Sequence, residues 1–429
     1  MEYSSTIMIE TSLLQAYADI CITVGVNLRK GQCLLINTAA GTYGFARVLA
    51  DRAYVHGARF VRINVIDNQL TRSRLNHASP EELDWLPNYL LNESYEYLAQ
   101  DWARIRIDST EEMEVLKDVD SSALARLQSA QRSLLKRQQE ALMSNKHAWL
   151  VIAAPGPEWA RWVFRHSGPE LAKLADSLSD AEATDRLWQK LVPILRLDRP
   201  DPVAAIRAHL AALAERCRKL DSLKLDGLRF VNADTDLFVG LNAASLWCGA
   251  DAALPDGRTF MANFPTEEVF TTPDWRRTRG RVKASRPVSV METLVHEAWF
   301  EFVDGKVVES GAKTGGQVLR KFLEMDEGAS FLGEVALVAG DSPIFKSGLL
   351  FGSILFDENA SCHIAVGAGY PSCLAGAEKL TSPALTKEAG CNVSMVHTDF
   401  MIGTPQTDVF GVQADGGEVA IIRQGSFVI

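Results

Sequence analysis

The chain has 429 residues, with 44 Lys and Arg against 54 Asp and Glu, so that 44 − 54 gives a formal net charge of −10. Hydrophobic residues make up 47% and charged residues 23%, which excludes a disordered or fibrous chain and is typical of a globular one. The length predicts two domains, each large enough for its own core. The negative balance disfavours nucleic acid as a partner, because its phosphates would be repelled.

No window approaches the roughly 18 apolar residues that span a bilayer. Residues 1–5 lack the basic flank and apolar run of a secretory signal. The seven cysteines are scattered and contain no CxxC pair, which is typical of reduced thiols rather than of a disulfide framework. These features predict a cytoplasmic protein with no membrane association.

The first half alternates helical and strand-like segments. Apolar residues recur at helical spacing from Leu13 to Val24 and from Phe45 to Ala53, and Gly57 suits a left-handed cap after the second helix. Strands interleaved with helices predict an α/β domain with a mostly parallel sheet, of unspecified strand order. The strand-like runs are residues 33–36, 60–65, 103–107 and 149–153.

Residues 180–220 are predicted to be helical throughout, with a helix start at Asp201-Pro202 and an apolar face that includes Leu213 and Cys217. After residue 223 glycine becomes frequent and short β-like runs dominate, with one helix at 316–323. We therefore predict an N-terminal α/β domain at 1–223 and a β-rich α+β domain at 224–429. The expected strands are residues 230–231, 237–239, 288–290 and 299–303.

Several familiar catalytic signatures are missing. The sequence has no GxGxxG after a strand, no GxxxxGK[ST] loop and no GxSxG elbow. His296-Glu297 begins like the zinc motif HExxH, but position 300 is Phe. The remaining chemistry lies in acidic and histidine residues of the second half.

The clearest candidate pair is His397 and Asp399. If residues 396–402 form a strand, these two side chains point the same way, and an imidazole beside a carboxylate suits a divalent metal. A salt-bridged pair on a solvated strand face explains this short motif equally well.

Three glutamates and a second histidine extend this set. Small residues separate Glu358 from His363, so a loop can bring both to one centre, although a hydrogen-bonded core histidine also explains His363. Glu334 stands in an apolar run with Leu332 and Ala336 expected on its strand face, and its burial is costly unless its charge is paired.

Glu268 is the last candidate, and by itself Glu267 is equally good. Three glutamates, two histidines and one aspartate could hold two adjacent cations with one bridging carboxylate. The oxygen-rich donor set suits Zn, Co, Mn or Mg and argues against a thiolate site.

At these residues the chain resembles the aminopeptidase T family, the thermophilic-type metallo-aminopeptidases that include aminopeptidase S. The resemblance extends over the whole chain and is most specific in DENASCH. The similar blocks are VGVNLRKGQCLLIN (24–37), DPVAAIRAHLAAL (201–213), NFPTEEVFTTPD (263–274), FLGEVALV (331–338), LFDENASCHIAVGAGYP (355–371) and HTDFMIG (397–403).

The resemblance implies roles for particular positions. It favours Glu268 over Glu267 as a metal ligand, and it implies Tyr370 as an active-site tyrosine. For proton transfer to the leaving amine, Glu268 and Glu334 are both candidates. The implied metal ligands are Glu268, Glu334, Glu358, His363, His397 and Asp399.

The resemblance also implies a two-domain, homodimeric, cytoplasmic peptidase that removes N-terminal residues from peptides with free N-termini. The N-terminal domain would support the cavity and the dimer, and the C-terminal domain would hold two divalent metal ions and a metal-activated water.

Two alternatives stay open. Some relatives with this fold are mononuclear iron dioxygenases that open hydroxylated pyridine rings, and two ions per chain would separate the peptidase from them. The second alternative is an amidohydrolase or a binding protein for a specialised metabolite, which a substrate screen would identify. A structural or nucleic-acid-binding role fits least, because the unusual residues cluster as ligands.

Overall fold

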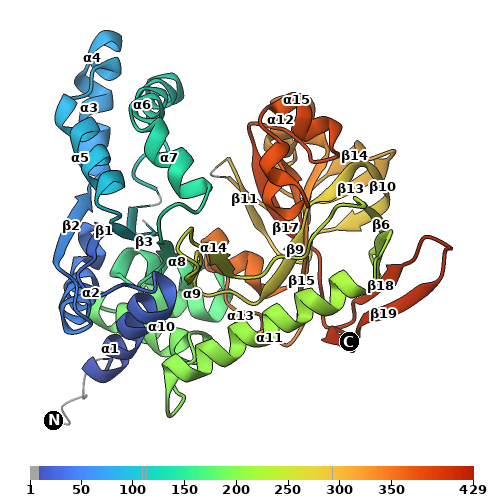
Figure 1. Cartoon of the computed structure of the whole chain (residues 1–429), viewed down its shortest axis with the longest axis horizontal. Helices are drawn as coiled ribbons and strands as arrows, with labels where there is room; N and C mark the ends of the chain where they lie inside the picture. The colour runs from blue at the N-terminus through green and yellow to red at the C-terminus, as the bar shows by residue number, and fades with distance from the viewer. Residues whose placement is uncertain (1–8, 109, 113, 292) are drawn as a thin grey trace. The chain divides into compact units, whose positions relative to one another are not determined.

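The computed structural model describes residues 9–108, 110–112, 114–291 and 293–429 (Figure 1). Residues 1–5, which bear on the expected absence of a secretory signal, lie outside the described residues. The chain forms two compact units, Met1–Ala208 with Asp251–Pro265, and His209–Ala250 with Thr266–Ile429. The predicted boundary at 223/224 lies after helix α11 (Pro202–Ser222), whereas the two units divide within that helix.

The first unit is built on a four-stranded sheet in the order β2-β1-β3-β4. Each neighbouring pair is parallel, which confirms the predicted parallel α/β architecture. The strand order places the two chain neighbours β2 and β3 on opposite sides of β1, a feature that the sequence pattern did not predict. The strands are β1 (Cys33–Ala39), β2 (Phe60–Ile66), β3 (Ala103–Ile107) and β4 (Trp149–Ile152).

Helices connect these strands, and Figure 1 shows α3, α4 and α6 beyond the ends at which β2 and β3 finish. Gly57 has a φ of +88° after the second helix, as expected for a left-handed cap. The helices are α1 (Thr11–Ile20), which continues as a π-helical turn (Cys21–Gly25), α2 (Tyr43–Val55), α3 (Asn68–His77), α4 (Pro80–Asp84), α5 (Asn88–Ala99), α6 (Ser121–Leu134), α7 (Lys136–Met143), α8 (Pro157–His166), α9 (Pro169–Ala175) and α10 (Asp180–Ile194).

An aromatic cluster explains why residues 251–265 belong to the first unit. The ring of Tyr17 stacks on Phe45 with centroids 5.0 Å apart and meets Phe264 at 5.7 Å. The Tyr17 hydroxyl donates a hydrogen bond of 2.9 Å to the Ala153 carbonyl, so the buried phenol is satisfied. The segment also forms a hairpin of β7 (Asp251–Ala253) and β8 (Thr259–Met261).

The prediction that 180–220 is helical throughout is wrong in its middle, because residues 195–201 separate α10 from α11, but the predicted helix start at Asp201-Pro202 is confirmed. Arg196 has a φ of +56°, which no α-helix accommodates. A new helix then starts where Asp201 accepts a hydrogen bond of 2.9 Å from the Ala204 N–H. The predicted apolar face of α11 is buried, including Leu213 and Cys217.

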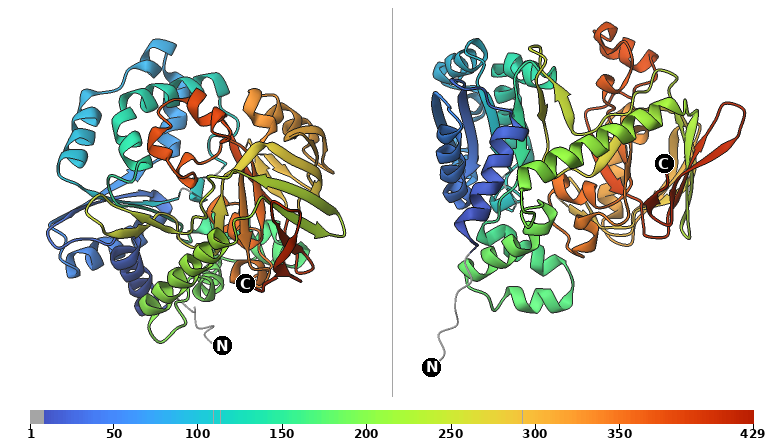
Figure 2. Two further views of the ribbon diagram at one scale, coloured as in Figure 1. Left: turned by 45° about the vertical axis from the view of Figure 1, so that its right-hand side comes forward. Right: turned by 60° about the horizontal axis from the view of Figure 1, so that its bottom comes forward.

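The second unit contains an eight-stranded sheet in the order β14-β13-β10-β6-β5-β18-β19-β20, visible in Figure 2. All its neighbouring strands are antiparallel, as expected for a β-rich domain. The strands are β5 (Gly227–Asn232), β6 (Thr235–Leu241), β10 (Pro273–Lys283), β13 (Trp299–Val303), β14 (Lys306–Gly311), β18 (Asp408–Val412), β19 (Glu418–Arg423) and β20 (Ser426–Phe427).

A four-stranded antiparallel sheet in the order β17-β16-β15-β9 lies in the same unit. Its strands are β9 (Glu268–Thr271), β15 (Leu332–Val338), β16 (His363–Gly367) and β17 (His397–Met401). A hairpin of β11 (Val288–Val290) and β12 (Thr293–Val295) completes the strands. The helices are α12 (Gly316–Leu323), with the predicted bounds, and the short α13 (Pro343–Lys346), α14 (Ile354–Asp357) and α15 (Pro383–Glu388).

The two larger sheets of this unit share one hydrophobic core. Phe300 of β13 meets Phe400 of β17 edge to face, with centroids 4.8 Å apart. Val335 and Ile364 contribute to the same core from β15 and β16. Because side chains alternate along a strand, the residues next to these core residues project from the opposite face of the four-stranded sheet, away from the core.

Among the described residues, no helix combines the length and apolar composition required to cross a membrane.

Candidate metal centre

The face of the four-stranded sheet opposite the core carries the predicted site residues. Glu334 of β15 is paired with Ala365 of β16, and Ala365 is paired with Asp399 of β17. Directly paired residues share a face, as do residues two apart on one strand. Glu334, Asp399, His363, His397 and Glu268 therefore project from the same side, although they come from four separate strands.

Small residues keep the centre of this face open. Ala365 stands between Glu334 and Asp399, and Ala336 is paired with His363. Neighbouring strands lie about 4.8 Å apart, so the Cα atoms of Glu334 and Asp399 are separated by roughly two such spacings with only a methyl group between them. The long side chains can therefore converge above the sheet.

Two overlapping groups of three ligands result, one formed by Glu268, Glu334 and His363 and the other by Glu334, His397 and Asp399. Within each group, one potential ligand atom per residue lies within 4.8 Å of the others. Glu334 belongs to both groups. Its Oε1 lies 3.8 Å from His363 Nε2, and its Oε2 lies 3.4 Å from His397 Nε2.

Both imidazoles are oriented by the backbone. Nδ1 of His397 lies 2.8 Å from the Ala368 carbonyl, and Nδ1 of His363 lies 3.2 Å from the Ser361 carbonyl. A carbonyl acceptor assigns the proton of a neutral ring to Nδ1 and leaves the Nε2 lone pair for a metal. The two histidines thus present Nε2 to the carboxylates.

A cation would satisfy the potential ligand atoms of this cluster better than hydrogen bonds among them do. Glu268 Oε2 lies 3.1 Å from His363 Nε2, yet within the described part of the chain this buried oxygen has no hydrogen-bond partner. Asp399 Oδ1 is likewise buried without such a partner among the described residues. Buried carboxylate oxygens without donors are costly, and a metal ion would satisfy them. The carboxylate and imidazole donors fit a divalent ion such as zinc or manganese.

The pKa values of the cluster residues also indicate a cation site. Burial, with the nearby charges of Asp399 and Glu268, raises the pKa of Glu334 to about 7. Burial alone would lower the pKa of His363, but Glu268 and the other carboxylates raise it to about 10. Burial and Asp399 oppose each other at His397, whose pKa rises to about 11. The protein alone therefore retains protons here that a bound cation would displace.

Glu358 lies beside these groups rather than within either of them. Burial and the charges of Glu268 and Asp399 raise the pKa of Glu358 well above its ordinary value, so the structure places it within electrostatic reach of the cluster. It begins a short 3₁₀ turn between α14 and β16. The loop is held by Asp357, which accepts hydrogen bonds of 3.0 and 2.7 Å from the N–H groups of Phe351 and Gly352.

Glu267 and Glu268 point to different neighbours. Glu268 meets His363, whereas Glu267 Oε2 lies 3.5 Å from Nε2 of His209 on α11. Strand alternation sends adjacent side chains to opposite sides, which explains the separation. Of the two glutamates, the structure brings only Glu268 into a three-ligand group among the described residues.

Tyr370 lies at the edge of the cluster. Its hydroxyl is 3.4 Å from His397 Nε2, and its ring meets Phe270 of β9 edge to face. Burial and the surrounding carboxylates raise the pKa of Tyr370 above its ordinary value. The phenol is therefore protonated and can donate a hydrogen bond.

The expected position of Leu332 is wrong. The register of β15 and β16 shifts between Leu332 and Glu334, so Leu332 is paired with Val366 and joins the hydrophobic core. This bulge contains Gly333, where a Cβ would lie 2.0 Å from the Ala368 carbonyl oxygen. Leu332 therefore faces away from Glu334, while Ala336 shares its face as predicted.

Asn359 was not identified from the sequence. This fully buried side chain accepts a hydrogen bond of 2.6 Å from the Glu267 N–H and donates one of 3.1 Å to the Leu355 carbonyl. Asn359 thereby connects Glu267, which precedes Glu268, to the segment that carries Glu358. Its place in DENASCH was the available signal, but that block was interpreted only through its charged residues.

His296 has no part in the cluster. It forms an isolated bridge with Thr314 between β12 and α12, with a backbone hydrogen bond of 3.2 Å. This agrees with the incomplete HExxH motif.

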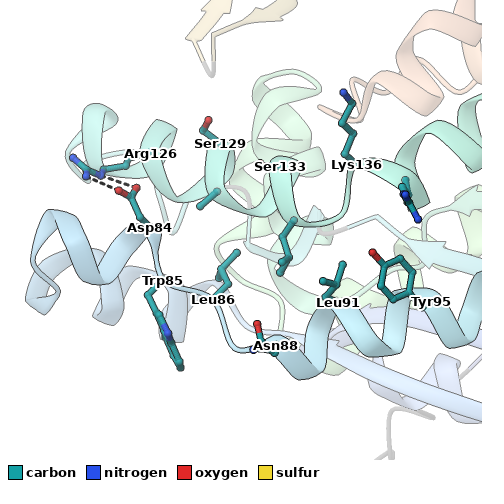
Figure 3. A pocket seen from close by; sticks show the side chains of 13 residues that line it. Asp84, Trp85, Leu86, Asn88, Leu91, Tyr95, Arg126, Ser129, Ser133 and Lys136 are labelled. Atoms are coloured by element: carbon teal, nitrogen blue, oxygen red, sulfur yellow. Dashed lines mark hydrogen bonds and ion pairs between the residues drawn. The ribbon is translucent and has the colours of Figure 1, made fainter.

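A groove of about 1040 Å³ lies in the first unit, between α5 and α6 (Figure 3). Its wall includes the exposed Trp85, and the Arg126–Asp84 ion pair lies at one end. Leu86 and Leu91 form apolar parts of its lining. No group of three metal-binding side chains from the described residues lies in it, so the groove offers no second candidate metal centre.

Comparison with known proteins identifies the family. Residues 10–427 match the family described as thermophilic metalloprotease (M29). Aminopeptidase T of Thermus thermophilus is 38% identical over 97% of this chain and 98% of its own, and aminopeptidase AmpS of Bacillus subtilis is 33% identical over 96% and 98%. The solved structure of wild-type AmpT from Thermus thermophilus superposes with a TM-score of 0.87 at 36% identity, covering 97% of this chain and 99% of that one. The chain therefore belongs to the thermophilic metalloprotease (M29) family.

Proposed function

We propose that the chain removes N-terminal residues from peptides by means of two divalent ions held in its second unit. Metallo-aminopeptidase activity, that of a hydrolase and exopeptidase, follows from its family and from relatives named aminopeptidases. Neither the dioxygenase nor the amidohydrolase alternative gains support from these relatives. The proposed ligands are Glu268, Glu334, Glu358, His363, His397 and Asp399.

The observation that carries the two-ion proposal is the position of Glu334. Its two carboxylate oxygens face different histidines, Oε1 toward His363 and Oε2 toward His397, and each histidine belongs to a different three-ligand group. A carboxylate with one oxygen in each group is suited to bridge two cations. A single ion would need only one of these groups.

When bound, the ions supply a Lewis acid for the peptide carbonyl and lower the pKa of water, to about 7 on zinc. The chain's own residues complete the reaction. The protonated hydroxyl of Tyr370 donates a hydrogen bond to the oxygen of the attacked carbonyl, where negative charge develops. If Glu334 holds both ions, Glu268 would carry a proton to the leaving amine through whichever of its two oxygens is not bound to metal.

The proposal includes a homodimer that acts in the cytoplasm on peptides with free N-termini. Residues 1–223 would support the cavity and the dimer, and residues 224–429 would hold the ions. Similarity over nearly the whole length of the relatives supports keeping both parts in one function. Sedimentation analysis tests the dimer, and a monomer would contradict it.

Metal analysis combined with a peptide panel tests the function. We expect two divalent ions per chain, loss of aminoacyl anilide hydrolysis on chelation, and recovery when metal is added. Peptides with free N-termini should be cleaved and N-blocked peptides should not. Full activity of the metal-free protein would contradict the metallohydrolase proposal, and one redox-active iron would favour the dioxygenase.

A matched pair of variants tests the ligand assignment. Glu268→Gln should lower the metal content and hydrolysis, whereas Glu267→Gln should leave the metal content near that of the parent, because Glu267 faces His209. Equal metal loss in both variants would contradict the choice of Glu268.

A further inference from the structure

Two cysteines flank Tyr370 in the second unit. Cys373 ends the 3₁₀ turn Pro371–Cys373, and its N–H donates a hydrogen bond of 3.0 Å to the Tyr370 carbonyl. Cys248 is paired with Phe270 of β9 through two backbone hydrogen bonds of 2.8 and 2.9 Å. The ring of Phe270 in turn meets the ring of Tyr370. Both cysteines are therefore coupled to the residue that we propose acts on the substrate carbonyl.

The same backbone pairing brings the two thiols together. The Leu246 N–H donates a hydrogen bond of 2.8 Å to the Cys373 carbonyl, and Ser245 forms an antiparallel bridge with Leu374. The Cys248 and Cys373 side chains are close enough for each to shift the pKa of the other. Two cysteines on adjacent, hydrogen-bonded backbone segments can reach the S–S bond length of about 2.05 Å when the segments move toward each other.

The two thiols differ in access and acidity. Cys373 is fully buried, whereas Cys248 is partly exposed, as is Cys33 of the first unit. The neighbouring Cys373 thiol lowers the pKa of the Cys248 thiol, while Cys248 and burial raise the pKa of Cys373. A more acidic, accessible thiol beside a buried partner is the arrangement of an attacking and a resolving cysteine.

We propose that Cys248 and Cys373 form a reversible disulfide with peroxide as the oxidant, and that this modification lowers the activity of the adjacent site. The Cys248 thiolate attacks one peroxide oxygen, the O–O bond breaks, and the leaving hydroxide takes a proton to become water. The Cys373 sulfur then attacks the resulting sulfenic acid, the S–O bond breaks as the S–S bond forms, and the Cys373 proton leaves in a second water. Two thiols and one hydrogen peroxide thus give one disulfide and two waters.

The effect on activity rests on the proposed function of Tyr370. Its backbone is fastened to Thr272, whose hydroxyl accepts a hydrogen bond of 2.9 Å from the Tyr370 N–H and donates one of 3.0 Å to the Tyr370 carbonyl. Drawing Cys373 toward Cys248 pulls on the turn that begins at Tyr370. Its hydroxyl then leaves its position beside His397, and kcat falls.

Oxidation of the metal-loaded enzyme by a small excess of hydrogen peroxide tests this inference. We expect mass spectrometry of non-reduced peptides to find Cys248 linked to Cys373, a fall in kcat of at least tenfold, and recovery with dithiothreitol. Cys248→Ser should keep the activity of the reduced parent and resist oxidation. Cys33→Ser should respond as the parent does, because its thiol lies in the other unit.

The outcomes separate the modification from the function. A linked peptide with unchanged kcat would overturn the regulatory effect, and oxidation of Cys248 beyond sulfenic acid without a link would overturn the disulfide. Linkage of Cys373 to Cys391 instead would also contradict it. Failure of the reduced parent to cleave peptides would contradict the proposed function alone, since the linkage is measured without substrate. In Cys373→Ser the sulfenic acid at Cys248 should persist and react with dimedone.

Discussion

Replacement of Asn359 by Ala tests how the ligand segments are held in register. The side chain is fully buried and connects the Glu267 N–H to the Leu355 carbonyl. Its removal leaves a buried donor and a buried acceptor unpaired, at a cost of about 1–3 kcal/mol for each. This cost would destabilise the two segments that carry Glu268 and Glu358.

The expected consequence extends beyond stability. Loss of a residue that orients metal ligands typically lowers metal affinity or activity by about 10- to 100-fold. We therefore expect Asn359→Ala to weaken metal binding by about that factor. Isothermal titration of the metal-free protein measures the affinity, and denaturant unfolding measures the stability.

Asn37→Ala provides the matched control. Asn37 is also buried, and its Oδ1 accepts a hydrogen bond of 3.0 Å from Asn64 in the parallel sheet of the first unit. The Asn37→Ala variant should lose stability while its metal affinity stays unchanged. If Asn359→Ala binds metal as tightly as the parent, or if both variants lose affinity equally, the inferred positioning role is refuted.

Three further substitutions test other parts of the structure. Tyr370→Phe should lower kcat about 100- to 1000-fold with unchanged metal content by elemental analysis, as for loss of an oxyanion donor, and an unchanged kcat would remove its proposed role. Glu111→Ala should lower the free energy of unfolding by about 1–3 kcal/mol in urea titrations, because the carboxylate accepts hydrogen bonds of 3.2 and 3.0 Å from two N–H groups of α8. An unaltered urea midpoint would contradict this. Gly333→Ala should weaken metal binding in calorimetry, since the new Cβ would meet the Ala368 carbonyl oxygen at 2.0 Å, whereas Gly316→Ala has open space and should not.

Local patterns predicted local structure well. The runs at 103–107 and 316–323 became β3 and α12 with the same bounds, because alternation or helical periodicity there is uninterrupted. The helical prediction over 180–220 included the start at Asp201-Pro202 but missed the end of the preceding helix at Ile194. The turn at Arg196 is a backbone feature that the spacing of apolar residues does not encode.

The candidate site was predictable as a set of residue types and not as a geometry. His397 and Asp399 share a strand face by simple alternation, and the structure has them so. The bulge at Gly333 reverses the expected face of Leu332, because one extra residue shifts the alternation. Asn359 was not predicted, because the role of an uncharged amide depends on its two backbone hydrogen-bond partners, which the sequence does not reveal.

The two faces of the small sheet explain how four buried carboxylates can be held close together. On the core side, Val335, Ile364 and Phe400 are fully buried, and each contributes about 1.5–3 kcal/mol by leaving water. A slip of one residue in any strand would place such side chains among the carboxylates and the carboxylates in the core. The apolar face therefore fixes the register, and the register positions Glu334 and Asp399. It follows that the arrangement of the ligands should persist without metal, with protons on part of the cluster, so that metal removal should abolish hydrolysis while leaving the circular dichroism spectrum unchanged.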